Sequence, residues 1–71
     1  MDRKTELEHL RQADAHIAAA RDRVERQTVL VARLMECGHE TTAAKSVLET
    51  MRDTLVVMQE QRRIIKKELE G

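Results

Sequence analysis

Two runs of apolar residues at alternating spacings of three and four, separated by one glycine, most constrain the fold. The first run has Leu10, Ile17, Val24 and Val31 seven residues apart, with Ala13, Ala20, Gln27 and Leu34 three residues after each. The second run is Ala44, Leu48, Met51, Leu55, Met58, Arg62, Ile65 and Leu69. This spacing is typical of helices that pack along one side, so we predict two amphipathic helices.

Gly38 is the only interior glycine, and the chain contains no proline. Glycine suits the left-handed position that ends a helix, and Thr41 or Thr42 can cap the next helix through its hydroxyl. We therefore expect one all-α domain, with helix 1 at about 3–37, a turn at 38–41 and helix 2 at about 42–70. A turn this short makes the helices antiparallel. The alternative is one continuous rod, because a helix tolerates glycine at a cost of about 1 kcal/mol.

Folding about the glycine predicts which residues of the two helices face each other. If the turn centres on Gly38 and His39, residue i lies opposite roughly residue 77−i. The alanines between residues 13 and 20 then face the bulky Met58, Ile64 and Ile65, and also Arg62. Small residues against large ones give the matched volumes of a packed interface.

The apolar surface exceeds what two helices can bury against each other. A chain of 71 residues with one cysteine and no aromatic residue has a small core and no internal disulfide. Beside the main series, helix 2 carries a second stripe of Ala43, Val47, Val57 and Ile64, with Thr50 and Thr54 nearby. We therefore predict a homodimer in which two hairpins form a four-helix bundle. The alternative is a loosely packed monomer with exposed valines.

The pattern of charge and hydropathy indicates where in the cell the protein is expected to be. The first residues are charged and no apolar segment follows them, so we expect no secretory signal. No apolar run approaches the ~20 residues that a membrane span needs. We therefore expect a cytoplasmic protein that does not enter a membrane.

Residues able to do chemistry are too few and too scattered for a metal or catalytic site. Cys37 and His39 flank the glycine, but a zinc site needs three or four ligands, and His9 and His16 lie far along the helix. We expect no cofactor, no metal and no enzymatic activity. His9, His16 and Arg23 share a stripe that we interpret as solvated, with a pH-sensing interface as the alternative.

Basic residues suggest a second kind of partner. The candidates for nucleic-acid contact are Arg21, Arg23, Arg26, Arg62, Arg63, Lys66 and Lys67. Acidic residues interleave with them, the formal net charge is zero and there is no aromatic residue to stack on bases. We therefore interpret them as a solvated helix face, in which Arg62 either fixes the register or extends its guanidinium to water.

One segment combines a few apolar and small residues on both sides of the glycine, namely Leu30-Val31, Leu34, Gly38-His39, Thr41, Ala44 and Val47-Leu48. Together with the N-terminal Leu7 to His16, this pattern resembles a family of small uncharacterised bacterial helical-hairpin proteins. The resemblance implies a short helical protein and no particular activity. The architecture is also similar to plasmid copy-number regulators, which dimerise as helical hairpins and bind RNA.

These observations favour a non-catalytic interaction or adaptor protein that acts through a helical-hairpin oligomer and docks a protein partner on an exposed helix face. The alternative is a small RNA-binding regulator that uses the arginine and lysine stripes.

Overall fold

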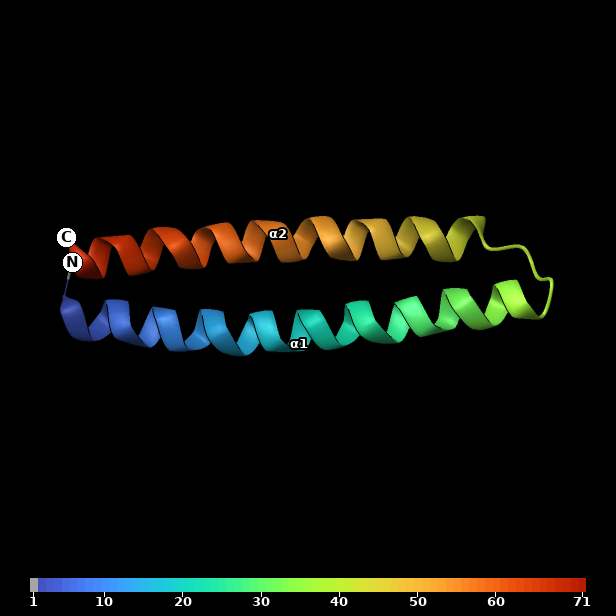
Figure 1. The fold of residues 1–71 in the computed structure, drawn as a ribbon. Coiled ribbons are helices and arrows are strands. Elements are labelled where there is room, and N and C mark those ends of the chain that lie inside the picture. The colour runs from blue at the N-terminus through green and yellow to red at the C-terminus, as the bar shows by residue number, and fades with distance from the viewer. Residues whose placement is uncertain (1) are drawn as a thin grey trace.

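The protein is an antiparallel two-helix hairpin in a computed structural model that describes residues 2–71. Helix α1 spans Arg3–Glu36 and helix α2 spans Thr42–Glu70, and no strand occurs among the described residues. The two helices lie side by side along their length, with both chain ends at one end of the rod and the turn at the other (Figure 1). The rod measures 53 × 14 × 13 Å. These bounds differ from the expected 3–37 and 42–70 only at the last turn of α1.

Both ends of α1 have a local cause in the sequence. Asp2 has extended backbone angles, and its Oδ1 accepts a hydrogen bond from the Lys4 N–H at 3.3 Å, which satisfies one free donor of the first turn. At the other end, Gly38 has a φ of +73°. The Gly38 N–H donates to the Met35 carbonyl and the His39 N–H donates to the Leu34 carbonyl. This pair of bonds is the Schellman motif, and it explains why the helix ends at the glycine.

The start of α2 differs from the prediction. Thr41 occupies the position before the helix, but its hydroxyl makes no capping hydrogen bond. Instead, the Glu40 carboxylate accepts from the Thr42 N–H at 2.8 Å and from the Thr42 hydroxyl. Glu40 can do this because a longer side chain, one residue further back, still reaches the free donors of the first turn. The prediction that a threonine hydroxyl caps the helix was therefore wrong.

The side chains that pack between the helices form one continuous line, which we call the seam. Its most buried apolar members are Ile17, Val31 and Leu48, at 5%, 7% and 7% exposed. The other members of the two apolar series are half-buried: Leu10, Ala13, Ala20, Val24, Gln27 and Leu34 on α1, and Ala44, Met51, Leu55, Met58, Arg62, Ile65 and Leu69 on α2. Among residues 2–71 no apolar side chain is completely enclosed, because two helices can cover only one side of each other.

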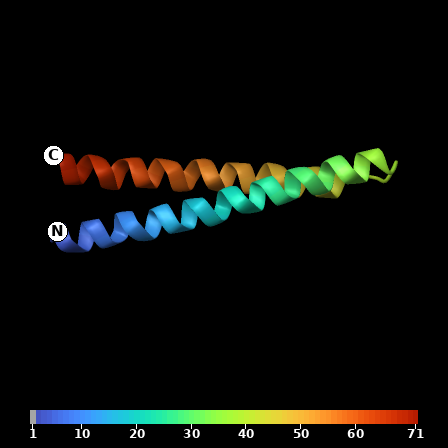
Figure 2. The same ribbon diagram turned by 60° about the horizontal axis from the view of Figure 1, so that its bottom comes forward.

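The pairing across the seam follows the expected 77−i in the middle of the rod, where the Arg62 Nε donates to the Asp14 carboxylate and Ala18 and Gln59 line one depression. Two long side chains reach further towards the turn. Gln27 Nε2 donates to the Ala44 carbonyl at 2.9 Å, and Arg3 reaches the Leu69 carbonyl. Both partners lie closer to the turn than that rule predicts. Val47 and Thr54 are exposed beside the seam. The helices also cross obliquely, as a view along another direction shows (Figure 2).

Candidate interaction surface

The hairpin has two broad faces, one on each side of the seam. On one side, Ala20 and Arg23 of α1 share a shallow depression with Thr50, Met51 and Thr54 of α2. We call this side the threonine face. On the other side, Asp14, Ala18 and Arg21 share a depression with Gln59 and Arg62. We call this side the arginine face.

On the threonine face, α2 contributes a stripe without a single charged residue. Its members follow the helical alternation of four and three residues and are all exposed: Ala43, Val47, Thr50, Thr54, Val57, Gln61 and Ile64. Uncharged residues at seven successive positions are unusual in a chain of which 37% is charged. A helix face that only meets water does not need this pattern.

The two threonines in the middle of the stripe are less polar than their hydroxyls suggest. The Thr50 hydroxyl donates to the Ser46 carbonyl at 3.2 Å, and the Thr54 hydroxyl donates to the Thr50 carbonyl at 3.0 Å. Each hydroxyl therefore has a partner within its own helix and does not depend on water. As a result, the centre of the stripe can be covered by an apolar surface at low cost.

Large hydrophobic side chains are more often exposed than buried. Among the described residues, only Ile17, Val31 and Leu48 form the buried apolar core. Eight large hydrophobic residues are exposed, at 45% to 62%: Leu7, Val29, Leu30, Met35, Val47, Val56, Val57 and Ile64. Val47, Val57 and Ile64 belong to the uncharged stripe, and Leu30 follows Arg23 by one heptad on the same side of α1. Thus half of the exposed apolar residues gather on the threonine face.

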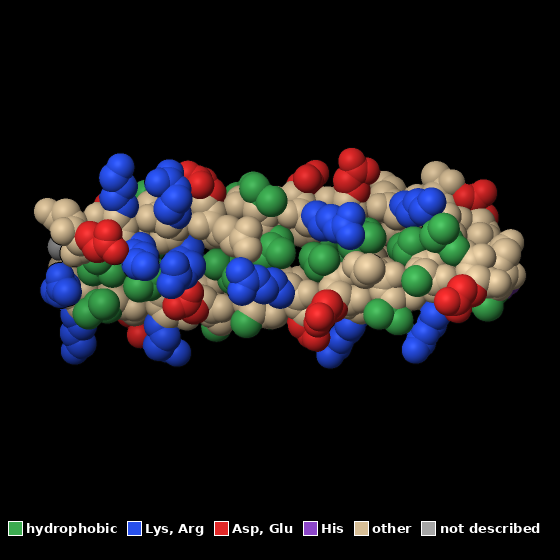
Figure 3. Space-filling view, viewed as in Figure 1, with side chains coloured by type: hydrophobic (Ala, Val, Ile, Leu, Met, Phe, Trp, Pro, Cys, Tyr) green, Lys and Arg blue, Asp and Glu red, His purple; other side chains and the backbone are tan. Residues whose placement is uncertain are grey.

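The arginine face is dominated by charge. The corresponding stripe of α2 is Thr42, Lys45, Glu49, Arg52, Val56, Gln59, Arg63 and Lys66. Arg62 leaves the seam on this side, and its Nε donates to the Asp14 carboxylate of α1. Figure 3 looks at the side of the rod on which lysine and arginine are spread over both helices, with apolar atoms along the groove between them. This face is suited to remain in water.

The residues predicted to contact nucleic acid do not form one patch. Arg21 and Arg62 share the depression of the arginine face, whereas Arg23 lies on the threonine face. Three of the seven make ion pairs, namely Arg26 with Asp22, Arg62 with Asp14 and Arg63 with Glu60. Lys66 and Lys67 are exposed near the end of α2. Four of the seven, Arg21, Arg62, Arg63 and Lys66, thus share the arginine face, where Asp14 and Glu49 lie among them.

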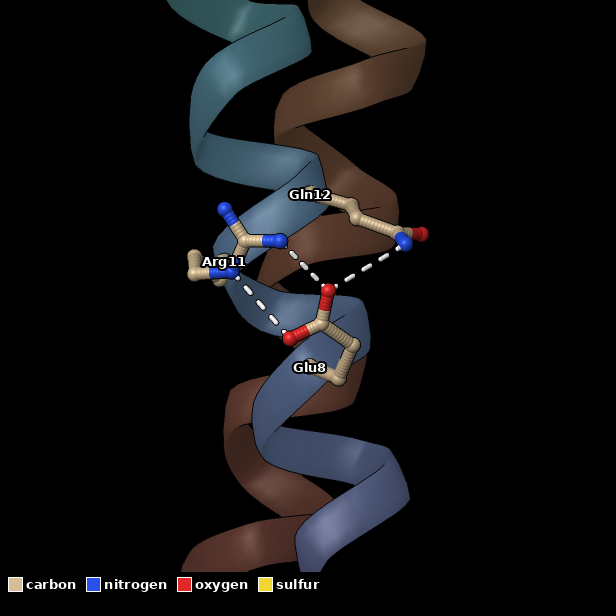
Figure 4. A network of polar contacts seen from close by, with 3 residues as sticks. All are labelled: Glu8, Arg11 and Gln12. Carbon is tan, nitrogen blue, oxygen red and sulfur yellow. Dashed lines mark hydrogen bonds and ion pairs between the residues drawn. The ribbon is translucent and has the colours of Figure 1, made fainter.

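Local ion pairs also hold the acidic side chains near the chain ends. Glu8 accepts two hydrogen bonds from Arg11, at 2.5 and 3.1 Å, and a third from Gln12 at 3.4 Å (Figure 4). The Arg11 hydrogen bonds lower the pKa of the Glu8 carboxyl, and Arg63 lowers the pKa of Glu60 in the same way. These pairs lie on the surface and within one helix. They support the helices locally and form no site.

The polar residues of the turn and of the histidine stripe are dispersed. Cys37 and His39 are both exposed beside Gly38. His9 and His16 line a shallow depression with Gln61 on the same side as the threonines. Among residues 2–71, no group of three or more His, Cys, Asp or Glu side chains is placed to hold a metal ion.

Glu6 is a buried residue that the sequence reasoning missed. It is 6% exposed, and one carboxylate oxygen lies 3.6 Å from Nδ1 of His9. Glu6 precedes Leu10 by four residues and therefore extends the apolar series of α1 by one position. This spacing could have identified it, but a glutamate is not expected in a seam.

In the described part of the chain, neither helix combines the length and the apolar character required to cross a bilayer. Comparison of the sequence with protein-family models and curated proteins, and of the structure with solved structures, finds no match. The resemblance to small bacterial helical-hairpin proteins therefore stays a prediction.

Proposed function

We propose that this protein is a non-catalytic interaction module of the cytoplasm, which forms a homodimeric four-helix bundle and acts as an adaptor for another protein. The observation that carries the proposal is the imbalance between three buried and eight exposed large hydrophobic residues in the described chain. Such an imbalance is typical of a chain that reaches its final packing with a partner. A second copy is the simplest partner, because two-fold symmetry closes the assembly.

The stability of so small a chain supports the same proposal. One hydrophobic core of this size supplies at most about 3–5 kcal/mol, and small proteins usually need a disulfide, a metal or a partner in addition. The only cysteine, Cys37, is free, and residues 2–71 contain no group of metal ligands. Association is the remaining source of stability that the chain offers.

The decisive experiment is the molar mass by light scattering across a hundredfold range of concentration, with far-UV circular dichroism on the same samples. We expect about twice the chain mass of 8.2 kDa, with high helix content throughout. A helical monomer at all concentrations would overturn the dimer. Binding to mixed RNA at low salt that weakens steeply with added salt would favour the nucleic-acid alternative instead.

A further inference from the structure

We propose that the threonine face is the dimer interface, and that a second copy of this chain covers it with its own α2 antiparallel to the first. This inference rests on the proposed dimer and adds the surface and the geometry. It has three supports: the chemistry of the face, its area, and the way in which its residues pair under two-fold symmetry.

The chemistry distinguishes the two broad faces. Covering the arginine face would take Lys45, Glu49, Arg52, Arg63 and Lys66 of α2 out of water. Removing charges from water is costly unless each finds a partner. Covering the α2 part of the threonine face removes no charge from water, and the hydroxyls at its centre already have partners in their own helix. α1 adds Arg23 to this face, but covering the threonine face still removes fewer charges from water than covering the arginine face would.

The area of the face is sufficient for a stable dimer. A side of the rod measuring 53 by 14 Å offers about 740 Å² per copy. Specific protein interfaces bury around 800 Å² per partner. A second hairpin of the same length can therefore supply a whole interface, and no larger partner is needed.

The stripe also pairs well with itself. With a two-fold axis perpendicular to the rod between Thr54 and Val57, Val47 of one copy lies opposite Ile64 of the other. Thr54 then lies opposite Val57. In these two pairs an apolar group meets an apolar group or a methyl-bearing threonine, and the third pair sets Thr50 opposite the amide of Gln61.

A two-fold axis along the rod gives a worse match. It would place α2 over α1 of the other copy, with Thr54 opposite Arg23 and Ala43 opposite Arg33. Neither arginine makes an ion pair among residues 2–71. Both guanidinium groups would lose water against a surface that offers no carboxylate. The antiparallel arrangement instead places the uncharged stripe of α2 against itself and leaves Arg23 and Arg33 against α1 of the other copy.

The first test uses two adjacent valines on different sides of α2. Val57 lies in the uncharged stripe and is 56% exposed, whereas Val56 lies in the charged stripe and is 62% exposed. Val57→Glu places a carboxylate in each half of the interface and should weaken dimerisation about 30-fold or more, as loss of a central contact does. Val56→Glu makes the same chemical change in water and should leave the dimer intact.

Light scattering and circular dichroism on both variants separate the two proposals. A helical monomer for Val57→Glu and a dimer for Val56→Glu supports the threonine face. A wild-type dimer that Val56→Glu dissociates, or that neither variant affects, overturns this inference and leaves the proposed dimer standing. A monomeric wild type overturns the proposed dimer itself.

The second test fixes the direction of the helices by disulfide cross-linking in a Cys37→Ala background. The double variant Val47→Cys, Ile64→Cys should form covalent dimers on oxidation, because the two positions meet only between antiparallel copies. Within one chain they are 17 residues apart on a helix, roughly 25 Å, which is too far for a disulfide. Each single variant should stay uncross-linked. Cross-linking of Val47→Cys alone, or its absence in the double variant, would overturn the antiparallel geometry.

Discussion

At the scale of single residues, the turn depends on the positive φ of Gly38. A residue with a Cβ is strained in this conformation by about 1 kcal/mol. An added Cβ would find no atom within 4 Å, so the strain is not increased by a clash. We expect Gly38→Ala to lower the free energy of unfolding by about 1 kcal/mol in urea titrations followed by circular dichroism.

Gly38→Asn is the matched control, because asparagine tolerates the left-handed region better than alanine does. It should lose less stability than Gly38→Ala. Equal losses for the two variants would contradict an explanation based on backbone conformation.

Also at the scale of single residues, Glu40 makes the stability of the start of α2 depend on pH. Its hydrogen bonds with the Thr42 hydroxyl and N–H lower the pKa of the carboxyl below its ordinary 4.5. Because the folded pKa is the lower one, the stabilisation is complete above the ordinary value and is lost as pH falls through the folded value. We expect Glu40→Ala to be less stable than wild type at pH 7, and the difference to disappear in acid.

Glu40→Gln separates the hydrogen bond from the charge, since its amide oxygen can still accept from Thr42. It should lose less stability than Glu40→Ala at pH 7, as urea unfolding at a series of pH values would show. A difference between wild type and Glu40→Ala that stays constant from pH 7 to pH 2 would refute the role given to the ionised carboxylate.

At the scale of the elements, the pairing of the helices depends on a few buried side chains. Ile17 is the most buried apolar residue, and its truncation removes contacts that two helices cannot replace by repacking. We expect Ile17→Ala to cost about 2–4 kcal/mol, which is most of the stability of such a chain, whereas Ile17→Val should cost about 1 kcal/mol. Thermal unfolding followed by circular dichroism would check both values. A loss below 1 kcal/mol for the alanine variant would place the core elsewhere.

At the scale of the elements, the sequence predicts which side of each helix packs, but not every residue on that side. The spacing of Leu10, Ile17 and Val24 predicts the packed side of α1 because helical geometry leaves only one side facing the partner. Folding about Gly38 also predicts the register to within a residue or so at Asp14 and Arg62. Glu6 was missed because its residue type contradicts its position. The cap by Glu40 depends on a side-chain conformation that no spacing encodes.

The interaction surface was predicted only in part. The stripe of Ala43, Val47, Val57 and Ile64 could be recognised from its periodicity. The structure was needed to show that Ala20 and Arg23 of α1 lie beside this stripe. The reason is that the conformation of the turn decides which stripe of α1 and which stripe of α2 lie on the same side of the seam. The hydrogen bonds of the Thr50 and Thr54 hydroxyls could be identified only from the side-chain positions in the structure.

At the scale of the whole molecule, the proposed dimer would couple association to folding. Anything that binds only the folded state raises the melting temperature, and a second copy does so in proportion to the logarithm of concentration. For a dimer of two 71-residue chains we expect the midpoint to rise by about 3–6 °C per tenfold increase in concentration. Calorimetry or circular dichroism over two decades of concentration would measure it.

Variants on the two faces make this coupling specific. Val57→Glu should melt at a lower temperature than wild type, and its midpoint should not depend on concentration, because the hairpin then unfolds alone. Val56→Glu should keep the dependence, since its carboxylate stays in water. If wild type and Val57→Glu melt at the same temperature whatever the concentration, the hairpin is stable by itself, and its exposed apolar residues are available to a different protein.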